Sequence, residues 1–432
     1  MSKSLVSRGR PERAVLVYVN DDDAEDTYVE EELEGLCEAA NVEVVGSLRQ
    51  RLDSPVRATF LGKGKLEELA VVCREVGAEI AIFDGEVSGI QQRNLEDAIK
   101  TRVVDRTQLI LDIFAKRART REGMLQVELA QLTTMLPKLM AVYTKFERQK
   151  GGIGMRGPGE TKLESDRRLV RDRISRLSDE LEEVKRHRSQ QRASRRKHPF
   201  PFATIAGYTS AGKSTLMNRL AGTDLLADAM PFATLDPTTR KIDLPDGYSL
   251  FLTDTVGFIR NLPTSLVAAF RSTLEEVTFS DFIIHVVDVS HEGWELQHEA
   301  VMETLAELGA AEKPVLTVLN KVDLLVDPND AFSKREAAEY LTGILDQIPN
   351  SVAISAFTGE GVPEFLRAVL RQVQDLLGFV KALVPYSESG LVQDCYDYGR
   401  VLVADYREDG IYVEAELVSE MRSKLDRYKV CD

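Results

Sequence analysis

A glycine-rich segment, Gly207 to Ser214 (GYTSAGKS), constrains this chain more than any other feature. It fits the pattern G-x-x-x-x-G-K-[ST], directly follows the apolar run 202–207 and precedes a run of helical composition, 215–222. Backbone N–H groups in such a loop wrap phosphates. Lys213 would neutralise the β- and γ-phosphate oxygens, and Ser214 would offer its hydroxyl to Mg²⁺. We therefore expect a strand–loop–helix unit that binds a nucleoside phosphate together with Mg²⁺.

Two later segments indicate which base the site accepts. The run Asn320 to Asp323 (NKVD) follows the apolar run 314–319. The carboxylate of Asp323 can accept hydrogen bonds from N1–H and the 2-amino group of guanine, and adenine offers neither donor. A site that leaves a buried polar group unpaired rejects the wrong base by ~10⁴-fold. Ser355 and Ala356, at the end of another apolar run, can place a backbone N–H on guanine O6, so we expect a guanine nucleotide.

The segment Asp254 to Gly257 (DTVG) and a threonine-rich segment before it supply the residues expected to sense the γ-phosphate. Asp254 can hold Mg²⁺ through water, and the Gly257 N–H can contact the γ-phosphate. Thr234 is the candidate switch threonine, because it would reach Mg²⁺ only when the γ-phosphate is present. Thr238 and Thr239 are rivals for that role.

The expected site residues divide by role. The expected metal ligands are Ser214, Thr234 and Asp254. Catalysis is expected to rest on Lys213, Gly257 and Thr234. The residues expected to contact GTP are Gly207, Tyr208, Thr209, Ser210, Ala211, Gly212, Lys213, Ser214, Thr215, Phe232, Ala233, Thr234, Leu235, Asp236, Asp254, Thr255, Val256, Gly257, Asn320, Lys321, Val322, Asp323, Ser355 and Ala356.

The pattern of apolar runs divides the chain into four parts, at 1–119, 120–198, 199–378 and 379–432. In the first part, expected strands alternate with amphipathic helices, which is typical of a parallel sheet. These strands are expected at 14–19, 42–48 and 79–85, and the helices at 28–40, 65–77 and 90–100. The second part has apolar residues spaced alternately four and three on both sides of 151–159, which predicts an antiparallel helical hairpin with a glycine loop at its tip. Pro137 should kink the first of these helices.

The third part predicts a second α/β domain, and the fourth a small end piece. The strands expected in the third part are 202–207, 239–244, 249–255, 281–289, 314–320 and 351–356, the second and third joined by a Pro-Asp-Gly turn. The fourth part should contain a hairpin, 401–406 and 411–417, around an Asp-Gly turn, followed by a short helix.

Charge is unevenly distributed along the chain. The total formal charge is −15, yet residues 138–197 hold 18 Lys and Arg against 9 Asp and Glu. This basic block covers the predicted hairpin and indicates one local contact with an anionic partner. The sequence shows no signal peptide and no run of about 18 apolar residues, so we expect no membrane span. The four scattered cysteines predict reduced thiols in a cytosolic protein, at Cys37, Cys73, Cys395 and Cys431.

In order and spacing, the five nucleotide-site segments resemble those of the translation-factor class of GTPases. The stretches 151–168, 60–69 and 232–240 resemble the HflX family more closely, and the resemblance covers nearly the whole chain, with the last 50 residues the least specific. The fold class is then α/β multidomain: an amino-terminal α/β domain, a helical hairpin linker, a P-loop GTPase G domain and a small α+β carboxy-terminal piece. The resemblance implies a cytoplasmic GTPase, partly ribosome-bound, that binds the large (50S) subunit and splits stalled 70S ribosomes. It also implies that the hairpin tip reaches toward the peptidyl-transferase region.

Basic residues of the hairpin would then contact rRNA phosphates. The candidates are Arg156, Lys162, Arg167, Arg168, Arg171 and Arg173. The alternative is a solvated helix face with a flexible linker. We expect a monomer.

Two positions depart from better-known GTPases. Phe258 stands where Ras-like enzymes have a glutamine that orients water, so hydrolysis by the isolated protein should be slow. The resemblance implies that the ribosome supplies the missing group. Ser210 stands where many family members have an asparagine that helps to bind K⁺, which puts potassium activation in doubt.

Other functions remain open. The segment Gly62 to Lys65 (GKGK) resembles a phosphate cradle, and the family has been suggested to bind ATP there, but it lacks the full P-loop spacing, so we expect a turn with two solvated lysines. An alternative overall function is a GTP-regulated RNA-binding factor in large-subunit assembly or RNA remodelling. A third is a signalling GTPase that uses the hairpin as a dimer seam.

Overall fold

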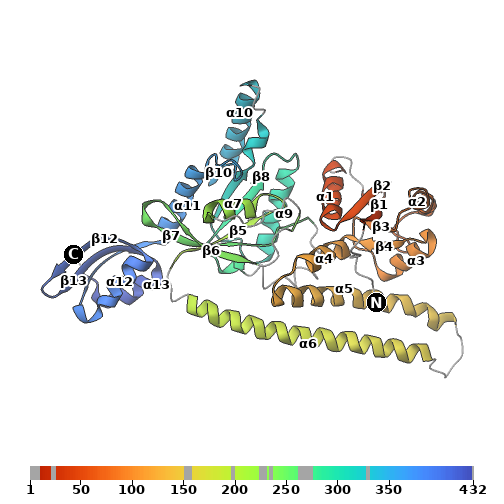
Figure 1. Cartoon of the computed structure of the whole chain (residues 1–432), viewed down its shortest axis with the longest axis horizontal. Coiled ribbons are helices and arrows are strands. Elements are labelled where there is room, and N and C mark those ends of the chain that lie inside the picture. Colours follow the sequence, from red (N-terminus) through yellow and green to blue (C-terminus); the bar gives the residue numbers. More distant parts are fainter. Residues whose placement is uncertain are drawn as a thin grey trace. The chain divides into compact units, whose positions relative to one another are not determined.

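The structure is a computed structural model, and it describes residues 10–20, 26–149, 158–195, 200–222, 231–232, 237–260, 276–326 and 331–430 (Figure 1). The chain divides into two compact units, which we describe separately. The first contains the chain up to Val184 together with Pro231 and Phe232, and the second contains the nucleotide-site segments and the carboxy-terminal piece.

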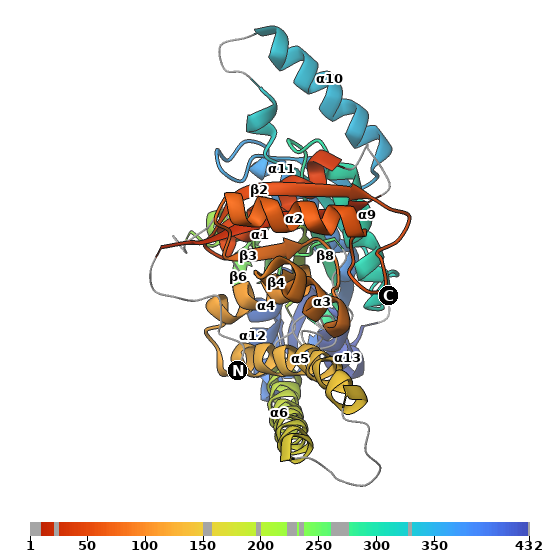
Figure 2. The same cartoon turned by 90° about the vertical axis from the view of Figure 1, so that its right-hand side faces the viewer.

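The amino-terminal unit is built on a four-stranded parallel sheet in the order β2-β1-β3-β4. Its strands are β1 (Glu12–Asn20), β2 (Val42–Arg51), β3 (Ile80–Phe83) and β4 (Arg102–Asp105), and its helices are α1 (Asp26–Ala39), α2 (Lys63–Glu75), α3 (Gly89–Ile99) and α4 (Arg106–Arg117). Helices α2 and α3 contact each other, as do α1 and α4, so each pair covers one face (Figure 2). The three predicted strands and three predicted helices are confirmed. The sequence missed β4 and α4 as separate elements, because a strand of four residues shows almost no periodicity.

The predicted helical hairpin is confirmed: α5 (Arg121–Gln149) and α6 (Pro158–Arg195) run side by side (Figure 1). The two helices share an apolar seam made by Leu125, Leu177 and Leu181, with Leu129 and Leu132 packed against it. Helix α5 continues through Pro137 and also packs against α3 and α4. The hairpin therefore contacts the helices of the amino-terminal domain, and Lys138 of α5 pairs with Asp105 at the end of β4.

The nucleotide-site segments belong to a six-stranded sheet in the order β10-β9-β8-β5-β7-β6. Its strands are β5 (Phe202–Gly207), β6 (Thr238–Asp243), β7 (Ser249–Asp254), β8 (Phe282–Asp288), β9 (Val315–Asn320) and β10 (Ser351–Ala353). All pairs are parallel except β6 with β7, which forms the predicted hairpin around Pro245–Gly247. Apolar residues of α7 (Lys213–Ala221) and α11 (Val362–Leu376) cover one face, and those of α9 (Trp294–Glu307) and α10 (Ala331–Gln347) the other. All six predicted strands are confirmed.

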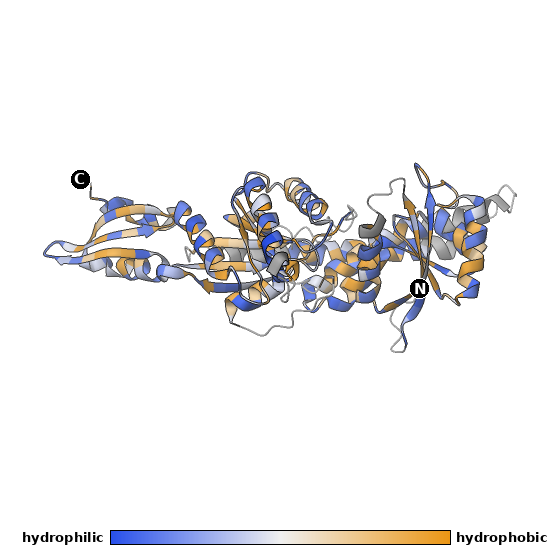
Figure 3. Ribbon diagram, turned by 90° about the horizontal axis from the view of Figure 1, so that it is seen from above, coloured by the Kyte–Doolittle hydropathy of each residue, from blue (hydrophilic) through white to orange (hydrophobic). Residues whose placement is uncertain are grey.

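The carboxy-terminal piece has an antiparallel sheet in the order β11-β13-β12. Its strands are β11 (Gly378–Val384), β12 (Arg400–Arg407) and β13 (Gly410–Leu417), with helices α12 (Ser389–Tyr398) and α13 (Ser419–Leu425). Hydrophobic and hydrophilic residues alternate along these strands, since one face meets the helices (Figure 3). The predicted hairpin and short helix are confirmed, whereas β11 and α12 were missed.

The described cysteines are buried free thiols, at Cys37, Cys73 and Cys395. Burial raises the pKa of Cys37 to about 12 and that of Cys395 to about 11, so these thiols stay protonated near neutral pH. Cys431 lies outside the described residues. No helix in the described ranges is both long enough and apolar enough to cross a bilayer.

Candidate functional site

The phosphate loop joins the carboxyl end of β5 to the start of α7, as the sequence predicts. The Lys213 ammonium is buried and donates to the carbonyl oxygens of Gly207 at 3.0 Å and Tyr208 at 2.6 Å. Burial lowers the pKa of Lys213 to about 8, and the nearby Asp254 carboxylate raises it only in part. The loop therefore curls around a cation whose charge lacks a full counter-ion and would be stabilised by phosphate oxygens.

Ser214 and Asp254 meet beside this loop. The Ser214 hydroxyl donates to Asp254 Oδ2 at 2.9 Å, which joins the first turn of α7 to the end of β7. A hydroxyl and a carboxylate are hard oxygen ligands, the type that Mg²⁺ prefers. Two of the three predicted metal ligands are thus brought together. The third, Thr234, lies outside the described residues with its neighbours Ala233, Leu235 and Asp236.

Two glycines permit the close packing of this site. Gly212 has a φ of 95°, and a Cβ there would lie 2.2 Å from Asn320 Nδ2. A Cβ at Gly257 would lie 3.0 Å from Thr209 Cα and 3.1 Å from Lys213 Nζ. A side chain at either position would displace a residue of the site, and at Gly212 the left-handed backbone conformation also favours glycine.

The segment after Gly257 is hydrogen-bonded to the phosphate loop through its main chain. The Phe258 N–H donates to the Gly207 carbonyl at 3.0 Å, and the Thr209 N–H donates to the Phe258 carbonyl at 2.8 Å. Phe258 is buried, and the Tyr208 hydroxyl accepts from the Arg260 N–H at 2.7 Å. The Phe258 ring is thus buried in the protein interior, and it carries no polar group that could orient a water molecule.

The side chains of Thr255 and Val256 are buried within the protein and do not face the predicted ligand. Thr255 is fully buried, and its hydroxyl donates to the Ile205 carbonyl at 2.7 Å. Val256 is also buried. Their side chains therefore fix β7 to β5, which leaves Asp254 and Gly257 on either side of them at the predicted ligand.

Asn320 joins the phosphate loop to the loop after β10, which contains Ser355 and Ala356, the pair predicted to contact the base. Its Nδ2 donates to the Ala211 carbonyl at 2.8 Å, and its Oδ1 accepts the Ala356 N–H at 2.9 Å. Ser355 is fully buried and its N–H donates to the Glu360 carbonyl at 2.9 Å. The loops that end β5, β9 and β10 are therefore hydrogen-bonded into one site at the carboxyl edge of the sheet.

The remaining residues of the NKVD segment, which is predicted to contact the base, follow β9 directly. Lys321 has a φ of 67°, and its ammonium lies 2.6 Å from Asp288 Oδ2. Val322 is buried. Asp323 Oδ1 is buried, and no described residue donates a hydrogen bond to it. A buried carboxylate oxygen without a donor is costly, and a ligand N–H would satisfy it.

Arg219 is a site residue that the sequence did not reveal. It lies on α7, and its Nε donates to the Ala356 carbonyl at 2.6 Å while its terminal nitrogen donates to the Phe357 carbonyl. The guanidinium thereby anchors the loop after β10 to α7. No motif marks this arginine, because the contact depends on how α7 lies relative to the loop after β10.

Three further residues predicted to contact GTP have different surroundings. Phe232 is buried with a φ of 58°, and its ring packs edge-on against Phe114 of α4, with ring centroids 4.6 Å apart. It belongs to the amino-terminal unit, so the structure does not group it with the phosphate loop. Ser210 is exposed with a φ of 61° at the crest of that loop. Thr215 lies half-buried in the first turn of α7.

The basic residues of the hairpin have unequal surroundings. Arg168 and Arg171 are exposed on α6, and Arg167 is half-buried. Arg173 makes a two-pronged ion pair with Glu128 of α5, at 2.7 Å and 2.8 Å, so its charge is engaged within the hairpin. Arg156 lies outside the described residues, and the structure describes the backbone of Lys162 but not its side chain.

The segment Gly62 to Lys65 opens α2. The Gly62 N–H donates to the Gln50 side-chain oxygen at 2.8 Å, and a Cβ at Gly62 would lie 2.8 Å from Gln50 Nε2. Lys65 pairs with Glu68 at 2.9 Å. The Gln50 side chain thus accepts a main-chain N–H that a phosphate cradle would offer to its ligand, and a second nucleotide site here stays the alternative to the predicted turn.

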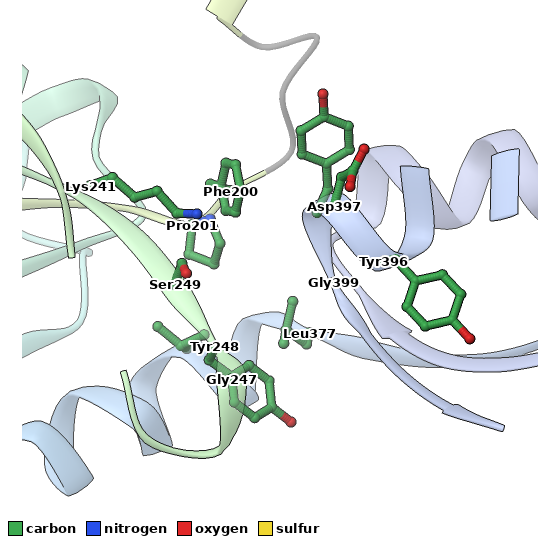
Figure 4. Close-up of a pocket in the computed structure, with 12 residues that line it drawn as sticks. Phe200, Pro201, Lys241, Gly247, Tyr248, Ser249, Leu377, Tyr396, Asp397 and Gly399 are labelled. Carbon is green, nitrogen blue, oxygen red and sulfur yellow. The ribbon is translucent and has the colours of Figure 1, made fainter. Parts of the chain in front are cut away.

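A small cavity of about 120 Å³ lies between the β6–β7 hairpin and α12 (Figure 4). Phe200 stands in it with its ring 4.9 Å below the Lys241 ammonium and 5.5 Å from the Tyr398 ring. Small-molecule sites usually exceed about 300 Å³, so this space is too small for a nucleotide. It marks the joint where the turn of the hairpin meets the carboxy-terminal piece, through Tyr248, Arg400 and Glu416.

Comparisons with known proteins match most of the chain up to residue 321 to GTPase family models. Family models match three consecutive regions: "GTP-binding GTPase N-terminal" at residues 28–115, "GTP-binding GTPase Middle Region" at 117–195 and "50S ribosome-binding GTPase" at 202–321. A solved GTP-binding protein from the archaeon Sulfolobus solfataricus, in complex with GDP, is 26% identical, with 84% of this chain and 99% of that chain covered and a TM-score of 0.42.

Curated relatives match over nearly the whole length. The GTPase HflX of Lacrimispora saccharolytica is 46% identical, with 96% of this chain and 95% of that protein covered. That of Caldanaerobacter subterraneus is 44% identical, covering 96% and 94%. That of Escherichia coli is 42% identical, with 92% of each chain covered. Because these relatives match over nearly the whole chain and family models match three consecutive regions of it, the chain belongs to the HflX family of GTPases.

Proposed function

We propose that this GTPase binds the large (50S) ribosomal subunit and, when loaded with GTP, splits stalled 70S ribosomes. The observation that carries the ribosomal part is the match of residues 202–321 to a family described as a 50S ribosome-binding GTPase. The exposed Arg168 and Arg171 on the long hairpin agree with an rRNA contact, since phosphates are bound chiefly by exposed cations. The proposal places the protein in the cytoplasm as a monomer, with part of the pool on ribosomes.

The described residues divide the work of holding GTP. Lys213 binds the β- and γ-phosphate oxygens, in exchange for the carbonyls of Gly207 and Tyr208 that it now contacts. Asp323 accepts from the guanine N1–H and 2-amino group with the oxygen that lacks a donor. Asn320 keeps both loops in register, through Ala211 and Ala356.

The residues present fit a magnesium ion. Ser214 and Asp254 lie 2.9 Å apart through their oxygens, and Thr234 would complete the set. When bound, Mg²⁺ neutralises charge on the phosphate oxygens. Thr239 is a weaker candidate for the switch than Thr234, because its hydroxyl is hydrogen-bonded to that of Thr253 within the β6–β7 ladder.

Hydrolysis by the free protein should be slow. Phe258 is buried and held by main-chain bonds to the phosphate loop, so it cannot turn out to orient a water molecule. The missing group would come from the ribosome, which makes hydrolysis a consequence of binding. Potassium activation is not part of the proposal, because Ser210 lacks the amide oxygen that an asparagine would offer.

Sedimentation of 70S ribosomes with the protein tests the proposal. With GTP or a non-hydrolysable analogue, the 70S peak should fall and free subunits should rise, and GDP should have little effect. The alternative is a GTP-regulated RNA-binding factor in large-subunit assembly or RNA remodelling, favoured by the same exposed arginines. It predicts binding to 50S particles or their precursors while the 70S peak is unchanged, and that result would overturn splitting.

A further inference from the structure

Arg219 lies in the last turn of α7 and is exposed, where a basic side chain is ordinarily explained by the helix dipole. Its guanidinium is nevertheless directed at another part of the chain. Nε donates to the Ala356 carbonyl at 2.6 Å, and a terminal nitrogen donates to the Phe357 carbonyl. One planar group thus holds two successive carbonyls of the loop after β10, 137 and 138 residues further along the chain.

The loop passes close to this guanidinium at Gly359. That glycine has a φ of 95°, and a Cβ there would lie 2.7 Å from a terminal nitrogen of Arg219. A side chain at position 359 would therefore push the guanidinium away from its two carbonyls. The glycine permits the approach on which both hydrogen bonds depend.

Arg219 and Asn320 hold the two main-chain groups of Ala356. The Asn320 side-chain oxygen accepts the Ala356 N–H at 2.9 Å, whereas Arg219 donates to the Ala356 carbonyl. Within the loop, the Gly359 N–H donates to the Ser355 carbonyl at 2.9 Å, so the loop is closed on itself. Its position relative to α7 is therefore fixed by the arginine.

We propose that Arg219 is a positioning residue for recognition of the guanine 6-oxo group and so helps to determine which base the site accepts. The inference rests on the guanine site of the proposed function and adds a residue that does not itself touch the nucleotide. The 6-oxo group is expected to accept a main-chain N–H of this loop, and the 6-amino group of adenine would leave that N–H unpaired. Because nearly every residue carries the same main-chain donor, selectivity at this edge of the base depends on where the loop lies.

Base analogues separate this role from a general effect on the site. Inosine diphosphate keeps the 6-oxo group and lacks the 2-amino group, whereas 2-aminopurine riboside diphosphate keeps the 2-amino group and lacks the 6-oxo group. In competition titrations of the full chain, Arg219→Ala should weaken GDP and inosine diphosphate equally, by about 2- to 10-fold, the loss expected for one neutral hydrogen bond. The preference for GDP over the 2-aminopurine nucleotide should fall by that same factor, and the preference for GDP over inosine diphosphate should be retained.

Two further variants isolate the geometry of the guanidinium. Arg219→Lys keeps the charge but carries a single terminal nitrogen instead of a planar fork, so its preference for GDP over the 2-aminopurine nucleotide should fall as in Arg219→Ala. Arg367→Ala is the matched control, since Arg367 is an exposed arginine of α11 that pairs with Glu364 at 3.6 Å. It should bind all three nucleotides like the unaltered protein. Because Arg219 is exposed, its variants should fold normally.

An equal loss for all three nucleotides in Arg219→Ala would overturn the inference, because it would indicate a structural effect on the whole site. Unchanged affinities would also overturn it, as would full retention of the GDP preference by Arg219→Lys. Asp323→Asn in parallel separates the two levels. If it leaves GDP affinity unchanged, the guanine site itself is wrong; if it weakens GDP while Arg219→Ala keeps the preference of the unaltered protein, only the role of Arg219 fails.

Discussion

The side-chain oxygen of Asn320 accepts the Ala356 N–H at 2.9 Å, and this bond joins two loops that lie 36 residues apart in the chain. The amide nitrogen of the same side chain donates to Ala211 in the phosphate loop. The predicted base site and the phosphate loop are thus linked by one side chain. A substitution of a residue that contacts the base should therefore change the affinity for the whole nucleotide.

Asp323→Asn should lower GTP affinity by about 100-fold or more. The change removes a carboxylate that would accept two guanine N–H groups, each worth ~1.5–3 kcal/mol when the acceptor is charged. Xanthosine nucleotides should instead be favoured, because their 2-oxo group needs the donor that asparagine provides. Competition titrations measure both effects, and an unaltered GTP affinity would remove Asp323 from the site.

Ser214→Ala should weaken GTP binding and turnover by at least about tenfold, since losses around a metal ligand reach 10- to 100-fold. Thr234→Ala should spare GDP affinity, because its role requires the γ-phosphate. Titration with GDP and with a GTP analogue at fixed Mg²⁺ separates the two. If Thr239→Ala showed the pattern expected for Thr234→Ala, the switch threonine would be misassigned.

Lys213 should make nucleotide binding depend on alkaline pH. Its free pKa of about 8 means that it loses its proton as pH rises through 8, while a bound phosphate favours the charged form and raises that pKa. At pH 8.5, GDP binding should therefore take up most of one proton, and at pH 7.0 the uptake by this group should be small. Calorimetry in two buffers of different ionisation enthalpy measures the uptake.

Titration of His285 should not contribute to the proton uptake measured for Lys213. Burial lowers the pKa of His285 to about 3, so it stays neutral at both pH values. Its Nε2 lies 3.0 Å from Nδ1 of His298, which is also uncharged near neutrality because burial lowers its pKa. Absence of proton uptake at pH 8.5 would contradict the lowered pKa of Lys213.

How much of this site can be predicted from sequence depends on the range of the contact. The phosphate loop, Asp254 and Asn320 are visible because each ends an apolar strand with a fixed pattern. Arg219 is not, since its role follows from the contact of α7 with the loop after β10. The same holds for β4 and β11, whose assignment depends on neighbouring strands rather than on their own periodicity.

Replacing Arg167, Arg168 and Arg171 with alanine should weaken ribosome binding and flatten its salt dependence. Phosphate contacts release counter-ions, so binding that uses these arginines falls steeply with salt. GTP affinity should stay near normal, because the three residues lie on α6 and outside the nucleotide site. Arg173→Ala is an instructive comparison: its guanidinium is already paired with Glu128, so its effect should be smaller.

The measurement is co-sedimentation with 50S subunits over a range of salt concentrations, beside a GDP titration of the same variant. Ribosome binding that is insensitive to salt and unaffected by the triple substitution would remove this face of the hairpin from the rRNA interface.

The most direct test of GTP-gated splitting uses the Asp323→Asn protein and 70S ribosomes in a sucrose gradient. If occupancy of this site drives splitting, a non-hydrolysable xanthosine triphosphate analogue should convert 70S ribosomes to subunits with the variant, whereas the GTP analogue at the same concentration should not. The unaltered protein should show the opposite preference. Splitting by the variant that is independent of the base, or a 70S peak that persists with either protein under its own nucleotide, would contradict the account.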